Sequence, residues 1–149
     1  MTHLKRTNSD DTDFINLIVL LDRDLAIRDG EDHAFYNQYN KTDKIKHGVV
    51  FYEDDVAVGC GAFREKELDT VEIKRMYVHS DYRKKGIASQ VLAELEIWAK
   101  ENNYRYTILE TGKKQPEAIN LYQKLGYTII PNFPPYEQMD NSVCMKKTL

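Results

Sequence analysis

Three cations directly ahead of an apolar helical pattern form the first feature of the sequence that could do chemistry. Arg83, Lys84 and Lys85 precede Gly86 in the stretch "SDYRKKGIAS", residues 80–89. Cations at the N-terminus of a helix repel its dipole, whereas the unpaired backbone N–H groups there bind anions. Because glycine lets a ligand approach the backbone closely, the stretch predicts a site for a phosphate-like anion such as a pyrophosphate.

The stretch matches neither of two common phosphate-binding motifs. No G-K-S/T follows a run of glycines, as in a Walker loop, and the G-x-G-x-x-G pattern of dinucleotide-binding turns does not occur there. Taken alone, R-x-x-G-x-A is a weak pattern. The competing interpretation is a solvated basic turn that precedes a core helix.

Length and composition indicate one globular domain. The chain has 149 residues, of which 42% are hydrophobic and 30% charged, and its formal net charge is −3. A chain of this size can bury a substantial core without metals or disulfides, so we expect a single domain over residues 1–149. No apolar run approaches the roughly 18 residues of a membrane span, and the stretch MTHLKRTNSDD lacks the apolar segment of a signal peptide. We therefore expect a cytoplasmic protein with no membrane partner.

The charges are unevenly distributed along the chain. Residues 1–62 contain 7 Lys and Arg against 12 Asp and Glu, whereas residues 63–149 contain 14 against 12. The negative net charge and the lack of aromatic residues interleaved with the cations argue against nucleic acid as a partner. We expect residues 63–149, which carry the excess of cations, to bind the anion. The acidic first half suggests a cationic ligand, although a solvated surface also explains most of its carboxylates.

The cysteines and histidines do not predict a metal site. Cys60 and Cys144 are far apart and have no C-x-x-C partner, so we expect two small core residues and no disulfide. The four histidines lack the spacing of metal ligands.

Hydrophobic periodicity predicts strands and helices that alternate in the second half. Helical patterns cover residues 11–28, 32–39, 87–102 and 116–127. Strand patterns cover residues 47–53, 56–63, 70–80, 106–111, 127–130 and 141–147. The alternation requires a parallel crossover within a mixed sheet, so the expected fold class is α/β or α+β.

The strand over residues 70–80 should present two different faces. Strict alternation places Val71, Ile73 and Tyr77 on one face and Glu72 and Met76 on the other. A carboxylate would then share a face with Met76.

Four motifs follow one another from residue 72 onward. They are E-x-K-R-M-Y-V in a strand, R-K-K-G-I-A at a helix start, L-E-T-G, and A-I-x-L-Y-x-x-x-G-Y in a helix. This order resembles the GNAT superfamily of acetyl-CoA-dependent N-acetyltransferases. The similarity covers residues 48–147, and residues 1–47 fit the two N-terminal helices of that fold only loosely. It implies a GNAT fold, with a mixed, mostly antiparallel, twisted sheet and helices on both faces.

The resemblance also implies where acetyl-CoA lies. In the family the strand matching residues 72–78 separates from its neighbour, and the pantetheine arm lies in the gap, bonded here to the backbone of Met76 and Val78. An asparagine ahead of the fourth helix touches the pantetheine in many relatives, and its counterparts here are Gln115 or, one turn later, Asn120. The turn that matches the family's Q/R-x-x-G-x-G/A signature would hold the pyrophosphate and comprises Arg83, Lys84, Lys85, Gly86, Ile87, Ala88 and Ser89.

Acyl transfer from a thioester to an amine needs three groups. A base must take a proton from an alkylammonium with a pKa of about 10.4, a donor must stabilise the carbonyl oxygen, and an acid must protonate the thiolate. By the resemblance, Glu72 acts as the base, directly or through a water, and a backbone N–H near Tyr77 or Val78 stabilises the oxyanion. Tyr122 matches the tyrosine that faces the cofactor sulfur and is the candidate acid.

Both catalytic assignments have an alternative. Glu72 could be an exposed strand residue or pair with Lys74, and Tyr122 could be a core aromatic beside Leu121 and Leu125. Direct transfer in a ternary complex is favoured over an acyl-cysteine because both cysteines lie in predicted strands.

The expected function is therefore transfer of acetyl from acetyl-CoA to a primary amine of a small molecule or a peptide, without a metal. The alternative is a CoA-binding sensor or regulatory module that keeps the anion turn without turnover. The acceptor would be chosen by the N-terminal helices and the "PNFPPYEQMDN" loop. Edge strands could also pair two copies into a homodimer, although nothing in the sequence requires one.

Overall fold

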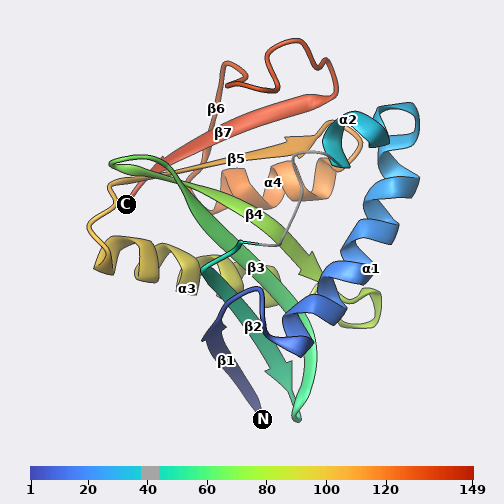
Figure 1. Cartoon of the computed structure of the whole chain (residues 1–149), viewed down its shortest axis with the longest axis vertical. Helices are drawn as coiled ribbons and strands as arrows, with labels where there is room; N and C mark the ends of the chain where they lie inside the picture. Colours follow the sequence, from blue (N-terminus) through green and yellow to red (C-terminus); the bar gives the residue numbers. More distant parts are fainter. Residues whose placement is uncertain (38–43) are drawn as a thin grey trace.

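Seven strands form one mixed sheet in the computed structural model of the chain, which describes residues 1–37 and 44–149. The strand order is β1-β2-β3-β4-β5-β7-β6, and all neighbours are antiparallel except β4 and β5 (Figure 1). The strands are β1 (Thr2–Thr7), β2 (His47–Glu53), β3 (Val56–Glu67), β4 (Thr70–Val78), β5 (Tyr106–Gly112), β6 (Thr128–Ile130) and β7 (Ser142–Thr148). The predicted mixed α+β fold is confirmed.

Helices cover both faces of this sheet (Figure 1). They are α1 (Thr12–Asp29), α2 (His33–Asn37), α3 (Ile87–Glu101) and α4 (Pro116–Lys124), with single 3₁₀ turns at Gly30–Asp32 and Ser80–Tyr82. Buried residues of α1 pack with Val50, Cys60 and Tyr77, whereas α3 and α4 pack on the opposite face with Val49, Phe63 and Leu109. The central strands β2, β3 and β4 therefore contribute side chains to both of these cores.

The predicted elements occur, with shifts of one or a few residues at their ends. The Asp11 carboxylate accepts hydrogen bonds from the backbone of Asp13 and Phe14 and so starts α1. Pro116 occupies the first turn of α4, where its missing N–H costs nothing. In the stretch predicted as a helix over residues 32–39, α2 covers His33–Asn37, and residues 38 and 39 lie outside the described part of the chain.

Sequence patterning missed β1, which pairs along its whole length with β2. Its residues are exposed or half-buried at a sheet edge, and only one of them, Leu4, is apolar, so the strand carries a weak apolar signal. Cys60 and Cys144 are both free and buried, as expected.

A bulge in β4 overturns the predicted alternation of that strand. Arg75 has a positive φ of 60°, and the pairing with β3 shifts between Cys60 and Ala62 because β4 there contains one extra residue. Val71 and Ile73 consequently lie in the same core as Met76 and Val78, whereas Tyr77 joins the core on the α1 face. The extra residue moves every later side chain of the strand to the other face.

The two parallel strands pair only over their first halves. Thr70–Ile73 of β4 pair with Tyr106–Leu109 of β5, and no pairing continues beyond Ile73 and Leu109. The bulge follows at once, at Arg75. The sheet is therefore divided between the C-terminal halves of β4 and β5.

Gly61 should be required for the packing of the bulged strand. A Cβ added there would meet the Met76 sulfur and would lie 2.9 Å from Val91 and 3.0 Å from Leu95. We expect Gly61→Ala to lower the free energy of unfolding by about 1–3 kcal/mol, the typical cost of overpacking, as measured by urea denaturation. Leu68→Ala, at a position 92% exposed, is the control and should stay within about 0.5 kcal/mol. Equal stability of the two variants would contradict this account of the packing.

Candidate active site

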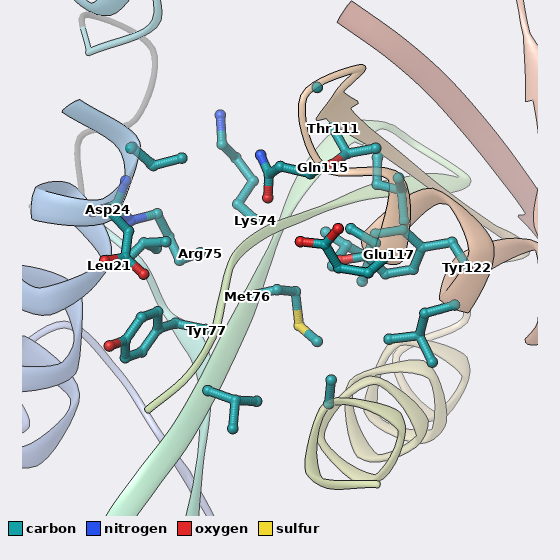
Figure 2. A pocket seen from close by; sticks show the side chains of 18 of the residues that line it. Leu21, Asp24, Lys74, Arg75, Met76, Tyr77, Thr111, Gln115, Glu117 and Tyr122 are labelled. Carbon is teal, nitrogen blue, oxygen red and sulfur yellow. The ribbon is translucent and has the colours of Figure 1, made fainter. Parts of the chain in front are cut away.

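A cleft of about 810 Å³ lies where β4 and β5 diverge (Figure 2). Its walls come from α1, the C-terminal halves of β4 and β5, the start of α3 and the inner face of α4. Figure 2 shows Arg75 and Tyr77 extending toward α1, near Leu21 and Asp24, and Met76 extending away from α1. The cleft therefore passes through the divided sheet and opens toward both layers of helices.

The predicted anion turn forms one wall of this cleft. Lys84 and Gly86 both adopt the left-handed conformation, with φ of 64° and 78°, and α3 begins directly after them at Ile87. No side chain caps α3, so the N–H groups of its first turn are available to an anion. A Cβ added at Gly86 would have nothing within 4 Å, so the glycine backbone faces open space.

Most of the predicted cofactor residues line the cleft. They are Met76, Tyr77, Val78, Arg83, Lys84, Gly86, Ile87, Ala88, Ser89 and Gln115. Two predicted residues do not. Lys85 is exposed, with its amine 5.3 Å from the centre of the Tyr82 ring. Asn120 is exposed on α4, because it precedes Tyr122 by two residues and so points to roughly the opposite side of the helix.

Arg83 bonds two groups of the chain at the wall of the cleft. Its Nη2 lies 2.9 Å from the Asp24 carboxylate of α1, and its Nε donates to the Val78 carbonyl at 2.9 Å. The side chain thus ties the anion turn to α1.

Tyr122 lies on the α4 side of the cleft (Figure 2). Its side chain is 8% exposed and packs against Tyr127 with the ring centres 5.8 Å apart. Burial raises the pKa of its hydroxyl to about 12, so the phenol keeps its proton at neutral pH. The side chain is thus at once a core residue and a protonated donor at the cleft.

Glu72 lines the cleft, but it lies on the opposite face of β4 from Met76 and not on the shared face that was predicted. It is buried on the α1 and α2 face, opposite Met76, because the bulge at Arg75 separates the two residues. One carboxylate oxygen accepts from the Arg64 guanidinium at 3.1 Å, and the other lies 3.8 Å from the Lys74 amine. Glu72 is therefore held by two cations.

Glu110 is a second carboxylate at the cleft, and the sequence analysis missed it as a site residue. It lies on β5 one residue past the end of the parallel pairing. Burial raises its pKa to about 7, while a hydrogen bond from the Ser142 hydroxyl at 2.8 Å opposes that shift. The L-E-T-G motif contained the residue, but only the position where the strands part indicates its role.

Glu110 and Tyr122 approach the cleft from opposite sides. Glu110 shares the α1 and α2 face with its partner Ser142 and with Tyr36, whereas Tyr122 belongs to the core beneath α3 and α4. A buried carboxyl that titrates near neutrality and a buried phenol that stays protonated suit a base and an acid respectively.

Over residues 1–37 and 44–149, no three histidine, cysteine, aspartate or glutamate side chains are grouped to hold a metal ion. No helix in that same part of the chain is long and apolar enough to cross a membrane.

A mixed sheet divided between two parallel strands, with an uncapped helix start at the division, defines the class of protein that the four sequence motifs resemble. The comparison with protein families agrees, since the model of the acetyltransferase (GNAT) family matches residues 15–127. The chain belongs to this family.

Curated relatives share about a third of the aligned residues. An uncharacterized N-acetyltransferase of Bacillus subtilis, YsnE, is 35% identical over 100 residues, which cover 66% of each chain. An IAA acetyltransferase of Azospirillum brasilense is 36% identical over 102 residues, covering 68% of this chain and 67% of that protein. The matched regions therefore span about two thirds of these relatives.

Solved structures share the whole fold. A Klebsiella pneumoniae protein assigned as an acyl-CoA N-acyltransferase aligns with a TM-score of 0.82 and 29% identity over 100% of this chain and 98% of that one. The PaiA N-acetyltransferase of Thermoplasma acidophilum, solved with coenzyme A, aligns with a TM-score of 0.74 and 14% identity over 100% and 99% of the two chains.

The raised pKa of Glu110 should make stability depend on pH. A carboxyl that titrates at about 7 when folded and at 4.5 when unfolded binds its proton more tightly in the native state. Its contribution to the free energy of unfolding is therefore lost as pH rises from 4.5 toward 7. We expect the free energy of unfolding of Glu110→Gln, relative to that of wild type, to be higher at pH 8 than at pH 5 by about 2–3 kcal/mol. Urea denaturation at the two pH values measures this difference.

The control for this pH dependence removes one negative charge elsewhere. Glu137→Gln, at an exposed position, should differ from wild type by the same small amount at both pH values. The free energy of unfolding of Glu110→Gln could also differ from that of wild type by the same amount at both pH values. That result would show that burial does not raise the pKa of Glu110.

Proposed function

We propose that this chain is an N-acetyltransferase that moves the acetyl group of acetyl-CoA directly to a primary amine. One observation carries the proposal: the gap between β4 and β5 has the uncapped start of α3 at its mouth and Glu110 and Tyr122 on its two sides. Family membership supports the reaction class. The acetyl-CoA-bound GNAT acetyltransferase of Elizabethkingia anophelis, which shares this fold at a TM-score of 0.71, supports the ligand.

The chain offers a separate element for each part of the cofactor. The N–H groups at the start of α3, beside Gly86, would bind the diphosphate. The backbone of Met76 and Val78, beyond the end of the β4–β5 pairing, would bind the pantetheine as an added strand. Arg83 bonds the Val78 carbonyl and Asp24, so it would exchange one of these partners for the cofactor.

The proposed step removes two protons from the attacking nitrogen and delivers one proton to the leaving sulfur. Glu110 takes a proton from the alkylammonium, and the neutral amine attacks the thioester carbonyl to form the new C–N bond. A backbone N–H near Tyr77 or Val78 stabilises the oxyanion. The C–S bond then breaks, and Tyr122 donates its proton to the leaving thiolate. The attacking nitrogen, which carries a positive charge after the attack, loses its second proton, and this proton restores the Tyr122 phenol. The proton held by Glu110 passes to solvent.

Glu110 suits the base role better than Glu72. Its pKa of about 7 leaves a large share of the carboxylate ionised and basic at neutral pH, the condition that favours a general base. Glu72 is engaged by Arg64 and Lys74, so each of its oxygens already has a cationic partner on that face. We therefore assign Glu110 as the base and Glu72 to ordering the cations of that face.

The cysteines favour direct transfer over a covalent intermediate. Burial raises the pKa of Cys60 to about 12 and that of Cys144 to about 11. Neither thiol is ionised at neutral pH, and the thiolate is the nucleophilic form.

The acceptor would enter from the α1 and α2 face, where Asp24, Asp29 and Glu110 line the cleft. These carboxylates favour an amine of a small molecule or a peptide. An N-acetylaspartate synthetase of Danio rerio is 39% identical to this chain over 71 residues. The product in its name, N-acetylaspartate, is a small molecule. Use of acetyl-CoA also fits a cytoplasmic location.

The alternative function is a CoA-binding sensor without turnover. A panel of primary amines mixed with acetyl-CoA, with free thiol followed over time, separates the two functions. We expect amine-dependent thiol release by the wild type and about 10²-fold lower kcat in Tyr122→Phe and in Glu110→Gln. Glu72→Gln should retain a larger share of kcat than Glu110→Gln. Thermal stabilisation by acetyl-CoA without thiol release from any amine would favour the sensor.

Gly86 provides the test of the diphosphate site. Gly86→Ala places a methyl group where the diphosphate would approach, so we expect the Kd for acetyl-CoA, measured by calorimetry, to rise at least about tenfold, a loss of about 1.4 kcal/mol. Gly30→Ala is the matched control, because Gly30 also has a positive φ and open space around its Cβ position but lies outside the cleft. Equal affinity in both variants would place the diphosphate elsewhere.

A further inference from the structure

Glu110 is held by a chain of two hydroxyl groups from other elements. The Ser142 hydroxyl, at the start of β7, donates to Oε2 of Glu110 at 2.8 Å. The Tyr36 hydroxyl, from α2, lies 2.7 Å from the same Ser142 oxygen. Ser142 is 4% exposed and Tyr36 is 4% exposed, so water competes little for either contact.

The direction of the chain follows from the number of hydrogens. A serine hydroxyl has one hydrogen and two lone pairs. Since Ser142 donates its hydrogen to Glu110, it must accept the hydrogen of Tyr36. Both O–H groups thus point toward the carboxylate, which favours its ionised form and fixes one of its oxygens.

We propose that Ser142 and Tyr36 are positioning residues for the base, which orient the Glu110 carboxylate toward the cleft and stabilise its ionised form. The proposal rests on the proposed function for its catalytic consequence, but the effect on the carboxyl itself does not require turnover. Neither residue was singled out by the sequence motifs, because the three side chains lie 74, 32 and 106 positions apart in pairs along the chain.

The hydroxyl chain also connects the base to the wall of the acceptor side. Tyr36 packs with Tyr136 and Cys144, and Phe35, Phe133 and Met139 surround this cluster. The same packing places α2 and the segment before β7 against the strand that carries Ser142. Displacement of α2 would therefore withdraw the Tyr36 hydroxyl from Ser142 and weaken the hold on Glu110.

Several charged or titratable groups besides Ser142 act on the Glu110 carboxyl. Lys74 lowers its pKa, whereas Asp29 and Glu72 raise it. The other titratable groups with which Glu110 interacts are Tyr36 of α2, Tyr136 of the segment before β7, and Cys144 of β7. Removing the Ser142 hydroxyl alters none of these charges, so it isolates the contribution of the hydrogen bond.

The test measures the pKa of Glu110 directly. Side-chain carboxyl carbons of glutamate, labelled with ¹³C, are titrated by NMR in the full chain, and the Glu110 signal is the one lost in Glu110→Gln. We expect a wild-type pKa of about 7 and a rise of about one pH unit in Ser142→Ala, the scale of one hydrogen bond to a charged group. Tyr36→Phe should give a smaller shift in the same direction.

Thr107→Val is the matched control. Thr107 is buried on the same strand as Glu110, and its hydroxyl lies 2.7 Å from the Tyr127 hydroxyl, outside the cleft. The variant removes one hydroxyl of a comparable buried pair, so it should lower the free energy of unfolding without changing the pKa of Glu110.

An unchanged or lowered Glu110 pKa in folded Ser142→Ala would overturn the proposal. If that variant does not fold, the absence of any shift in Tyr36→Phe does so instead. The acid limb of kcat/KM should move to higher pH by the same amount as the NMR pKa. A shift of the NMR pKa without a shift of this limb would leave the hydroxyl chain intact and remove Glu110 as the base.

Discussion

The early end of the hydrogen-bonded ladder between β4 and β5 is the constraint on which the rest of the site depends. Two parallel strands that paired to their ends would bury their facing backbone groups against each other and close the sheet. Here the pairing stops at Ile73 and Leu109, and the bulge at Arg75 turns β4 away. The facing edges of both strands are thereby exposed to the cleft, where a ligand can bond them as an added strand would.

The same division separates the two kinds of proton chemistry. On the α1 and α2 face, a buried carboxyl is kept near neutral pKa by desolvation, which the Ser142 hydroxyl partly offsets. On the α3 and α4 face, desolvation alone raises the pKa of Tyr122. Burial raises both values, yet it leaves one group a usable base and the other a protonated acid because their ordinary pKa values differ by more than five units. A single physical effect thus gives the two sides of the gap complementary roles.

Periodicity and local motifs were sufficient to predict the core elements and the turn that precedes α3. Gly86 and Ile87 lie where the sequence predicts the start of that helix, since a turn and a helix start are local features of the chain. The predicted orientation of Glu72 relative to Met76 was wrong because one inserted residue in β4 reverses the alternation of side chains. Nothing near Arg75 in the sequence marks that insertion. Glu110 and its partners Ser142 and Tyr36 could not be found from spacing, because only the folded sheet brings β5, β7 and α2 together.

The most direct measurement of the central claim is a crystal structure of the chain with a non-reactive acetyl-CoA analogue. The account predicts that the diphosphate contacts the amides at the start of α3, that the pantetheine is bonded to β4 beyond the bulge, and that the acyl carbon lies between the Glu110 carboxylate and the Tyr122 hydroxyl. A complex in which β4 and β5 close into a continuous ladder, with the analogue bound at another surface, would contradict it.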